Sequence, residues 1–225
     1  MRTLILTGAT GLIGEEFINL FSIHRNAKLI ILARKQPQFP LPKGVEFRLI
    51  EDFYDRSALR KALQDGSEMI CCIGTTIAKA GSKEAFEKTD VGIIRELAHA
   101  CSELQYSGFH YVSSIQASVE GSTFYLQCKG RAEAEIRFHS FSRITILRPS
   151  LLLGKRREFR LGEKIGMLAS TLFPFLFIGP MKAFKPIQAE TVAKCLLYRA
   201  MSDNEDTLIL ESEEIKSFIT LSINF

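Results

Sequence analysis

The sequence lacks any block of lysine and arginine long enough to indicate a nucleic-acid partner. Its densest basic run is KRREFR at positions 155–160, and the net charge of +4 is modest for a chain of 225 residues. A run of this length is typical of a solvated loop, with binding of phosphate or of an acidic substrate as the less favoured alternative. We therefore expect no nucleic-acid partner.

The five cysteines show no paired spacing typical of metal ligands, so we expect no metal site. Cys71 and Cys72 are adjacent in an apolar segment, where a free cysteine packs as a small hydrophobic residue. The apolar run at the N-terminus is too short for a signal peptide, because it breaks directly into a glycine turn. The odd number of cysteines and the missing signal peptide predict a reducing, cytoplasmic location.

The chain also lacks a long unbroken apolar run, an internal repeat and an interdomain linker. Residues 165–181 are strongly apolar, but Pro174 and Pro180 interrupt them, so we expect no integral membrane segment. We interpret this stretch as a helix and loop over the substrate end of a sheet. A hydrophobic lid, a dimer surface and a membrane-facing patch are the alternatives. The prediction is one domain over residues 1–225, with a cofactor-binding core at 1–150 and a substrate-side segment at 151–225.

What is present is an alternation of apolar strands and helices. An apolar fraction of 46% and a charged fraction of 24% are ordinary for a globular protein with a sizeable core. Continuously apolar segments predict strands at 4–7, 28–33, 45–50, 69–73, 109–113, 144–147 and 207–210. Helices are expected from residue 12, at 57–64 with Ser57 as N-cap, along an apolar stripe at 91–104, and at 124–139 and 190–200. This alternation predicts an α/β fold with a Rossmann-type doubly wound parallel sheet of order 3-2-1-4-5-6.

Three glycines, Gly8, Gly11 and Gly14, follow the first predicted strand and open the first helix. Glycine tolerates positive φ and lets the backbone approach a ligand closely, and the N–H groups at a helix start favour a pyrophosphate. A glycine triplet alone is weak support, but a strand before it and a helix after it are what a dinucleotide site needs. The residues expected to bind cofactor at this turn are Gly8, Thr10, Gly11, Leu12, Ile13 and Gly14.

Tyr125 and Lys129 are four residues apart on a predicted helix, which places them on one face. A nearby ammonium stabilises a phenolate, so a tyrosine in this position can exchange a proton with a carbonyl or an alcohol near neutral pH. Ser113 and Ser114 end the preceding strand at the carboxyl edge, where ligands bind in open α/β sheets. We choose Ser114 as the residue that hydrogen-bonds the substrate oxygen, because it is nearer the edge. Either serine could instead simply end the strand.

These features together resemble the short-chain dehydrogenase/reductase family, and in particular its atypical branch typified by the Tat-interacting-protein oxidoreductases. The resemblance is carried by CCIGTT at 71–76, KAG at 79–81, YVSS at 111–114, YLQCKGRAEAEI at 125–136 and LRPSLLLG at 147–154. It is clearest over residues 1–155.

The resemblance implies an NADP-binding Rossmann protein whose catalytic set is Ser114, Tyr125 and Lys129. It further implies that Asp52 contacts the adenine and that Gly74 and Thr75 line the cofactor. Many members carry an asparagine where this chain has Asp90, a departure from the usual four-residue proton relay. By resemblance only, a homodimer is plausible.

The choice of cofactor follows from the residues after the second predicted strand. An NAD site places a carboxylate there, whereas arginine suits a 2′-phosphate, and this chain has Arg34 and Lys35 without an acid. We predict NADPH, with Arg34 as the main contact and Lys35 in support, although Lys35 is as readily interpreted as a solvated loop charge.

The leading hypothesis is an NADPH-dependent oxidoreductase that transfers hydride to a small carbonyl substrate. The main alternative is a regulatory or interaction protein that binds NADPH with little or no turnover, because dinucleotide folds are reused for binding. A nucleotide-sugar epimerase or dehydratase ranks last, because it needs a larger substrate domain than the residues after 150 provide.

Overall fold

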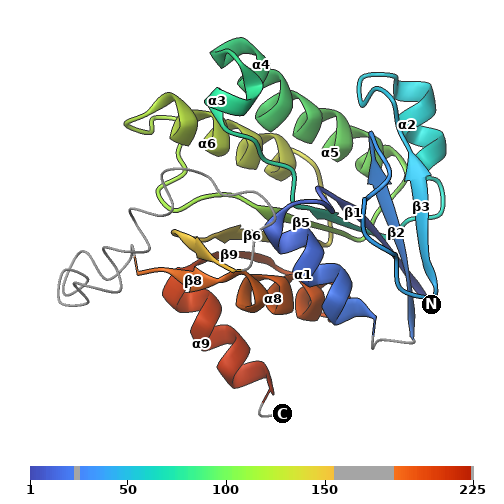
Figure 1. The fold of residues 1–225 in the computed structure, drawn as a ribbon. Helices are drawn as coiled ribbons and strands as arrows, with labels where there is room; N and C mark the ends of the chain where they lie inside the picture. Colours follow the sequence, from blue (N-terminus) through green and yellow to red (C-terminus); the bar gives the residue numbers. More distant parts are fainter. Residues whose placement is uncertain (23–25, 155–184, 224–225) are drawn as a thin grey trace.

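The computed structural model describes residues 1–22, 26–154 and 185–223. Seven parallel strands form one sheet in the order β3-β2-β1-β4-β5-β6-β9, and a two-stranded sheet pairs β7 with β8 (Figure 1). The strands are β1 Arg2–Thr7, β2 Ala27–Ala33, β3 Val45–Leu49, β4 Glu68–Cys71, β5 Gly108–Val112, β6 Arg143–Arg148, β7 Leu152–Leu153, β8 Ile187–Gln188 and β9 Thr207–Glu211. The predicted fold class is confirmed, and β9 extends the predicted six-strand order beside β6.

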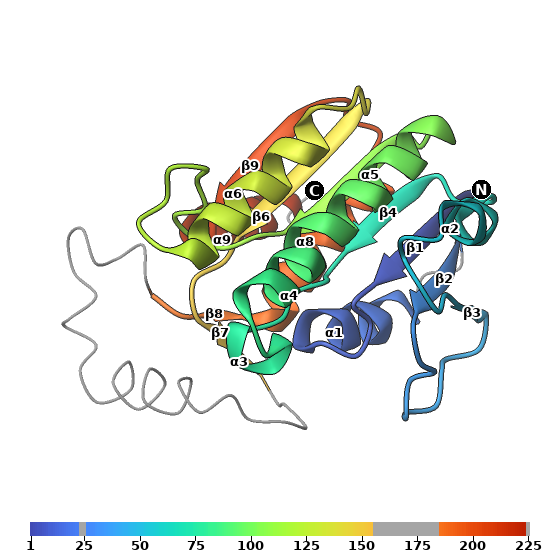
Figure 2. The ribbon, with the colours of Figure 1, turned by 90° about the horizontal axis from the view of Figure 1, so that it is seen from above.

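Helices cover both faces of the seven-stranded sheet. Figures 1 and 2 show α4, α5 and α6 on one face, and α1, α8 and α9 lie on the other. The helices are α1 Leu12–Phe21, α2 Arg56–Leu63, α3 Ile77–Ala80, α4 Lys83–Glu87, the π-helical turn η1 Lys88–Gly92, α5 Ile93–Glu103, α6 Phe124–Arg137, α8 Ala189–Met201 and α9 Ser212–Ile223. Among the described residues, none of these helices combines the length and apolar character needed to cross a bilayer.

Alternation along the strands divides the core between the two faces. In β1, Ile5 packs with α2, α5 and α6, whereas Leu4 and Leu6 pack with α1 and α8. Because both faces are covered, the central strands are apolar at successive positions rather than at alternate ones. This double burial is the physical reason that the strands were recognisable as continuous apolar runs.

A buried polar network lies near the amino ends of the central strands, on the face covered by α8. Its members, here called the amino-end network, are Glu68, His110, Arg143, Thr145 and Arg199. Glu68 pairs with Arg143 and His110, and the Thr145 hydroxyl joins His110 to Arg199 at 3.0 and 3.1 Å. The network links β4, β5, β6 and α8.

Several predicted boundaries are corrected. Asp55, not Ser57, caps α2, because its side chain accepts the Ala58 N–H at 3.0 Å. Strand β4 ends at Cys71, two residues before the predicted end, and α9 forms from a tail for which no structure was predicted. The apolar stretch 165–181 lies outside the described residues, so its interpretation stays a prediction, as does the division of the chain at residue 150.

Candidate functional site

The glycine turn between β1 and α1 has the geometry of a ligand cradle. Gly8 has φ of +75°, and a Cβ there would lie 2.4 Å from the Cys72 carbonyl group. A Cβ at Gly14 would lie 2.3 Å from the Gly8 oxygen, so neither position admits a side chain. Gly11 is exposed and N-caps α1 without a side chain to accept the first N–H groups. Those groups are therefore available to an anion.

The other residues predicted at this turn lie where the backbone, rather than the side chain, can face a ligand. Thr10 is exposed, and Leu12 is half-buried beside Gly154. The Ile13 side chain is 5% exposed and belongs to the core, so only its N–H can contact a cofactor.

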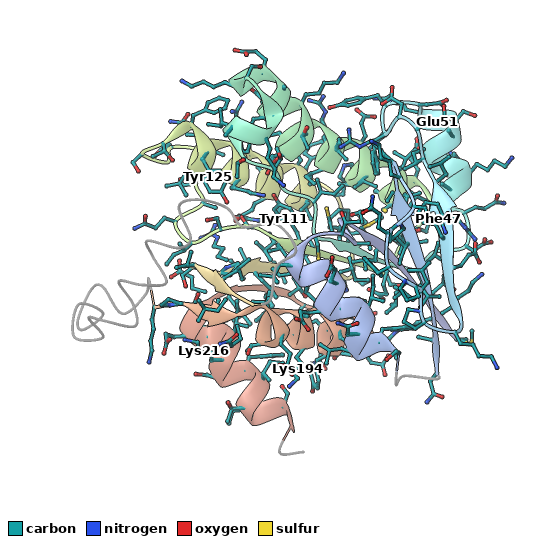
Figure 3. All side chains as sticks on the ribbon, in the orientation of Figure 1. Phe47, Glu51, Tyr111, Tyr125, Lys194 and Lys216 are labelled. Atoms are coloured by element: carbon teal, nitrogen blue, oxygen red, sulfur yellow. The ribbon has the colours of Figure 1, made fainter. Side chains whose placement is uncertain are left out.

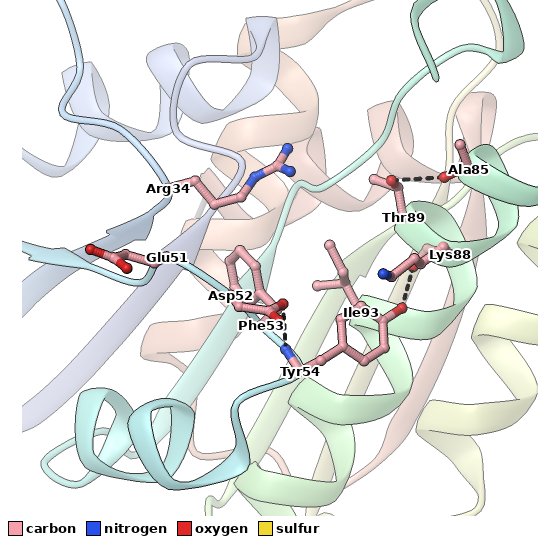
Figure 4. A pocket seen from close by; sticks show the side chains of 9 residues that line it. All are labelled: Arg34, Glu51, Asp52, Phe53, Tyr54, Ala85, Lys88, Thr89 and Ile93. Atoms are coloured by element: carbon pink, nitrogen blue, oxygen red, sulfur yellow. Dashed lines mark hydrogen bonds between the residues drawn. The ribbon is translucent and has the colours of Figure 1, made fainter. Parts of the chain in front are cut away.

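A pocket of about 230 Å³ opens at the ends of β2 and β3 (Figure 4). It is lined by two of the predicted cofactor residues, Arg34 and Asp52, but not by Lys35. Asp52 accepts the Tyr54 N–H at 3.0 Å, and the Lys88 ammonium lies 4.9 Å from the Tyr54 ring centroid. Lys88 was not predicted, because no local pattern marks the residue that a π-turn delivers to this pocket.

Three buried side chains meet at the carboxyl edge of the sheet, and we call them the carboxyl-edge cluster: Asp90 from η1, Tyr111 from β5 and Lys129 from α6. Lys129 Nζ lies 2.9 Å from Asp90 Oδ1 and donates a hydrogen bond to the Tyr111 hydroxyl at 3.1 Å. Asp90 Oδ2 accepts the Thr75 N–H at 3.0 Å. A Cβ on Gly74 would stand 3.4 Å from Lys129 Nζ, so Gly74 lies directly beside the cluster.

Burial acts against the charge on Lys129, but its neighbours reverse that effect. Burial lowers the pKa of the Lys129 ammonium, whereas Tyr111 and Asp90 raise it, and the net shift of the pKa is upward. Burial also raises the pKa of the Tyr111 phenol. Lys129 is therefore a cation, and Tyr111 is a neutral hydroxyl that accepts its hydrogen bond.

Tyr125 and the two serines lie around the same edge. Tyr125 is half-buried, one turn before Lys129 on α6, and its ring centroid is 5.8 Å from that of Phe86. The Ser113 hydroxyl is buried and donates to Glu133, whereas Ser114 is half-buried and makes no side-chain hydrogen bond with the described residues. The choice of Ser114 over Ser113 and the catalytic roles stay predictions.

Tyr111 is the residue of this site that the sequence analysis missed as a partner of Lys129 (Figure 3). A signal existed, because Phe109 and Tyr111 are two residues apart on one strand and share the face that α6 covers. The spacing of Tyr125 and Lys129 predicted a direct pairing of those two. Among the described residues, the hydrogen-bond and ion-pair partners of the ammonium are Tyr111 and Asp90 instead.

Comparison with known proteins agrees with this geometry. A family model described as NAD(P)H-binding matches residues 8–167. The mitochondrial protein FMP52 of Candida albicans is 34% identical over 198 residues, covering 86% of this chain and 85% of that protein. Protein HTATIP2 of Rattus norvegicus is 29% identical over 170 residues, covering 72% of this chain and 67% of that protein. The solved UDP-N-acetylglucosamine 4-epimerase of Bacillus cereus has a TM-score of 0.68 at 19% identity, covers 100% of this chain and 86% of its own, and shows a likeness of fold alone.

The predicted cytoplasmic location is wrong by the same comparison. Relatives at 29–35% identity are named as mitochondrial proteins. The prediction depended on free cysteines and on the absence of a secretory signal. Neither feature distinguishes the cytoplasm from an organelle with a reducing interior, so the inference was too narrow.

Proposed function

The chain belongs to the NAD(P)H-binding family of atypical short-chain dehydrogenases/reductases, and on that premise we propose that it is an NADPH-dependent oxidoreductase that reduces a small carbonyl substrate. The observation that carries the proposal is the placement of Ser114, Tyr125 and the Lys129 cluster at one sheet edge, beside a glycine turn that excludes side chains. Ligands of open α/β sheets bind at this edge.

The residues of the turn and pocket fit a dinucleotide. The glycine turn offers N–H groups to a pyrophosphate, and the pocket with Arg34 and Asp52 suits the adenosine end. When bound, NADPH supplies the hydride. Ser114 then holds the substrate oxygen, and Tyr125 donates the proton that the reduced oxygen needs. Lys129, fixed by Tyr111 and Asp90, lies one helical turn from Tyr125 on α6.

The preference for NADPH is part of the proposal, and Arg34 supports it. Arg34 is exposed and lines the adenosine-end pocket together with Lys88, so two cations border the expected place of a 2′-phosphate. Titration of the purified protein with NADPH and NADH, followed by fluorescence, should show tighter binding of NADPH. Arg34→Ala should lose about fivefold in NADPH affinity and little in NADH affinity, because an exposed charge contact contributes about 1 kcal/mol. Equal losses for both cofactors would contradict the assignment.

Catalysis is tested on the same sample with a panel of carbonyl compounds. Tyr125→Phe should keep NADPH affinity and lose about 10²–10⁴-fold in turnover, the usual contribution of general acid catalysis. Tyr198→Phe is the matched control, because this partly exposed tyrosine packs on Phe218 in the contact between α8 and α9, away from the carboxyl edge. Undiminished turnover in Tyr125→Phe would rule out the mechanism.

A second candidate is an NADPH-binding regulatory protein without turnover. The specific observation in its favour is that Lys129 bonds Tyr111 and Asp90, which are not the tyrosine expected to donate the proton. Tight NADPH binding without oxidation of NADPH on a broad carbonyl panel would favour this candidate.

A further inference from the structure

We propose that Asp90 is a positioning residue that acts through Lys129 to keep Tyr125 protonated, and so biases the site toward carbonyl reduction over alcohol oxidation. This inference rests on the proposed oxidoreductase function. It starts from the π-turn η1, which interrupts the helical course between α4 and α5 and carries Asp90. Asp90 is 0% exposed, and no other acidic side chain of the carboxyl-edge cluster accompanies it.

The two carboxylate oxygens of Asp90 make different contacts. Oδ2 accepts the Thr75 N–H at 3.0 Å, so one oxygen ties the residue to the loop after β4. Oδ1 lies 2.9 Å from Lys129 Nζ, an ion-pair distance, yet it makes no hydrogen bond with the described residues. A neutral amide would satisfy Thr75 equally well. The second oxygen therefore matters for its charge rather than for a hydrogen bond.

The charged and titratable groups around Lys129 leave Asp90 as its counter-ion. Strand β4 presents Cys71 and β5 presents Tyr111, and burial raises the pKa of both groups, so they stay neutral. On α6, the Glu133 carboxylate accepts hydrogen bonds from Arg148 and from Ser113. Arg131 on the same helix pairs with Glu87 of α4. The bonds that occupy these flanking groups are Ser113–Glu133, Arg148–Glu133 and Arg131–Glu87.

The ion pair of Lys129 and Asp90 carries no net charge, and this changes the electrostatic field at the Tyr125 hydroxyl. An unopposed ammonium one helical turn away would lower the pKa of the phenol and favour the phenolate, which accepts a proton from an alcohol. A carboxylate 2.9 Å from the ammonium opposes that field, which favours the role of the Tyr125 phenol as a proton donor. A proton donor is what carbonyl reduction needs: hydride adds to carbon, and the Tyr125 proton passes to oxygen to give the alcohol.

The test is Asp90→Asn, which keeps the acceptor for Thr75 and removes the charge. Tyrosine ionisation in the cofactor-free protein is followed by ultraviolet absorbance, with Tyr125→Phe and Tyr111→Phe versions of each protein to assign the transitions. The pKa of Tyr125 should fall by about one unit or more in Asp90→Asn. Asp203→Asn is the control, because Asp203 is an exposed carboxylate paired with Arg2. An unchanged Tyr125 transition in Asp90→Asn overturns the inference.

Asp90→Asn leaves a buried ammonium without its counter-ion, and this can destabilise the fold. A second variant therefore tests the inference without an unpaired buried charge. Asp90→Asn/Lys129→Met removes both charges, and its Tyr125 should titrate close to the wild-type value. A Tyr125 pKa far above the wild-type value in this double variant would show that Lys129 acts unopposed, and would overturn the inference.

Kinetics separates this inference from the proposed function. If carbonyls are reduced, the alkaline limb of kcat/KM should move to lower pH in Asp90→Asn by the same amount as the Tyr125 transition. If no carbonyl is reduced but the transition still moves, the proposed function fails, while the action of Asp90 on Tyr125 stands. A kinetic limb that stays in place while the transition moves would overturn the catalytic part of the inference.

Discussion

Two buried charge clusters occupy opposite ends of the same sheet, and they are built differently. In the amino-end network each polar group meets a partner: Glu68 holds Arg143 and His110, and Thr145 joins His110 to Arg199. In the carboxyl-edge cluster, Asp90 Oδ1 has an ionic neighbour but no hydrogen bond with the described residues, although the pair is buried.

This difference in hydrogen bonding distinguishes a cluster that stabilises the fold from one that is suited to a function. A closed, fully bonded network fixes strand and helix positions and has no surface for a ligand. A buried cluster with one atom that lacks a hydrogen bond is more typical of a functional site. The comparison therefore supports a stabilising role for the amino-end network and is consistent with the proposed chemical role of the carboxyl-edge cluster.

The largest effect is expected from Glu68→Gln in the amino-end network. Arg143 is 3% exposed, and loss of its counter-ion leaves a buried charge uncompensated, which costs about 3–5 kcal/mol. Denaturant unfolding at pH 7 measures the loss in free energy of unfolding. Glu46→Gln is the matched control, because Glu46 pairs with Lys28 and Arg48 at the surface, and its loss should cost about 1 kcal/mol or less. Equal losses in the two variants would remove the distinction between this network and a surface ion pair.

Two glycines, one beside each cluster, provide a second test of the difference between the amino-end network and the carboxyl-edge cluster. A Cβ on Gly108 would lie 1.9 Å from Glu68 Oε2, a side chain that Arg143 and His110 hold in place. A Cβ on Gly74 would meet Lys129 and Asp90 only at 3.4 and 3.6 Å, which is ordinary contact. Gly108→Ala should therefore cost about 1–3 kcal/mol from overpacking.

Gly74→Ala should leave stability within about 0.5 kcal/mol of the wild type, as is usual for substitutions that strain nothing. Unfolding of both variants by denaturant gives the two values under one set of conditions. A destabilisation by Gly74→Ala as large as that by Gly108→Ala would show that the carboxyl edge is as closed as the amino end.

The sequence was sufficient for the fold and for part of the site. Continuous apolar runs predicted the strands because both faces of the sheet are covered, and the glycine turn was predicted because its residues are adjacent in the chain. The N-cap of α2 was predicted at Ser57, but Asp55, which is an equally good capping residue, takes that place. The choice between them depends on the residue at which the preceding loop ends and the helix begins, which the local sequence does not determine.

The partners of Lys129 could not be predicted from spacing. Tyr125 is its neighbour along α6, but Tyr111 and Asp90 reach it from β5 and η1, so the contacts depend on how the elements pack. The π-turn that delivers Asp90 is itself a local departure from the helical period on which the prediction was based. Long-range packing therefore sets the contacts of Lys129, whose predicted role stays a prediction.

The sharpest test of the amino-end network is its response to pH. His110 is 0% exposed, and burial lowers its pKa, with Arg199 and Arg143 acting in the same direction against Glu68. The bonding fits a neutral ring: Nε2–H donates to Glu68, and Nδ1 accepts from the Thr145 hydroxyl, whose oxygen accepts from Arg199. A protonated His110 would add a third cation beside two arginines.

The unfolded chain takes up a proton on this histidine near pH 6.5, whereas the folded protein does so only at lower pH. Stability should therefore be full above pH 6.5 and fall as the pH drops below it, with a slope that reaches about 1.4 kcal/mol per pH unit for one proton. His110→Gln cannot bind that proton. Its free energy of unfolding, measured from pH 7.5 to 5, should therefore decline less steeply than that of the wild type. His139, whose pKa burial also lowers, contributes equally to both proteins and cancels in the difference. Parallel declines would mean that His110 is charged in the folded state, and the amino-end network would then be as imperfectly satisfied as the carboxyl-edge cluster.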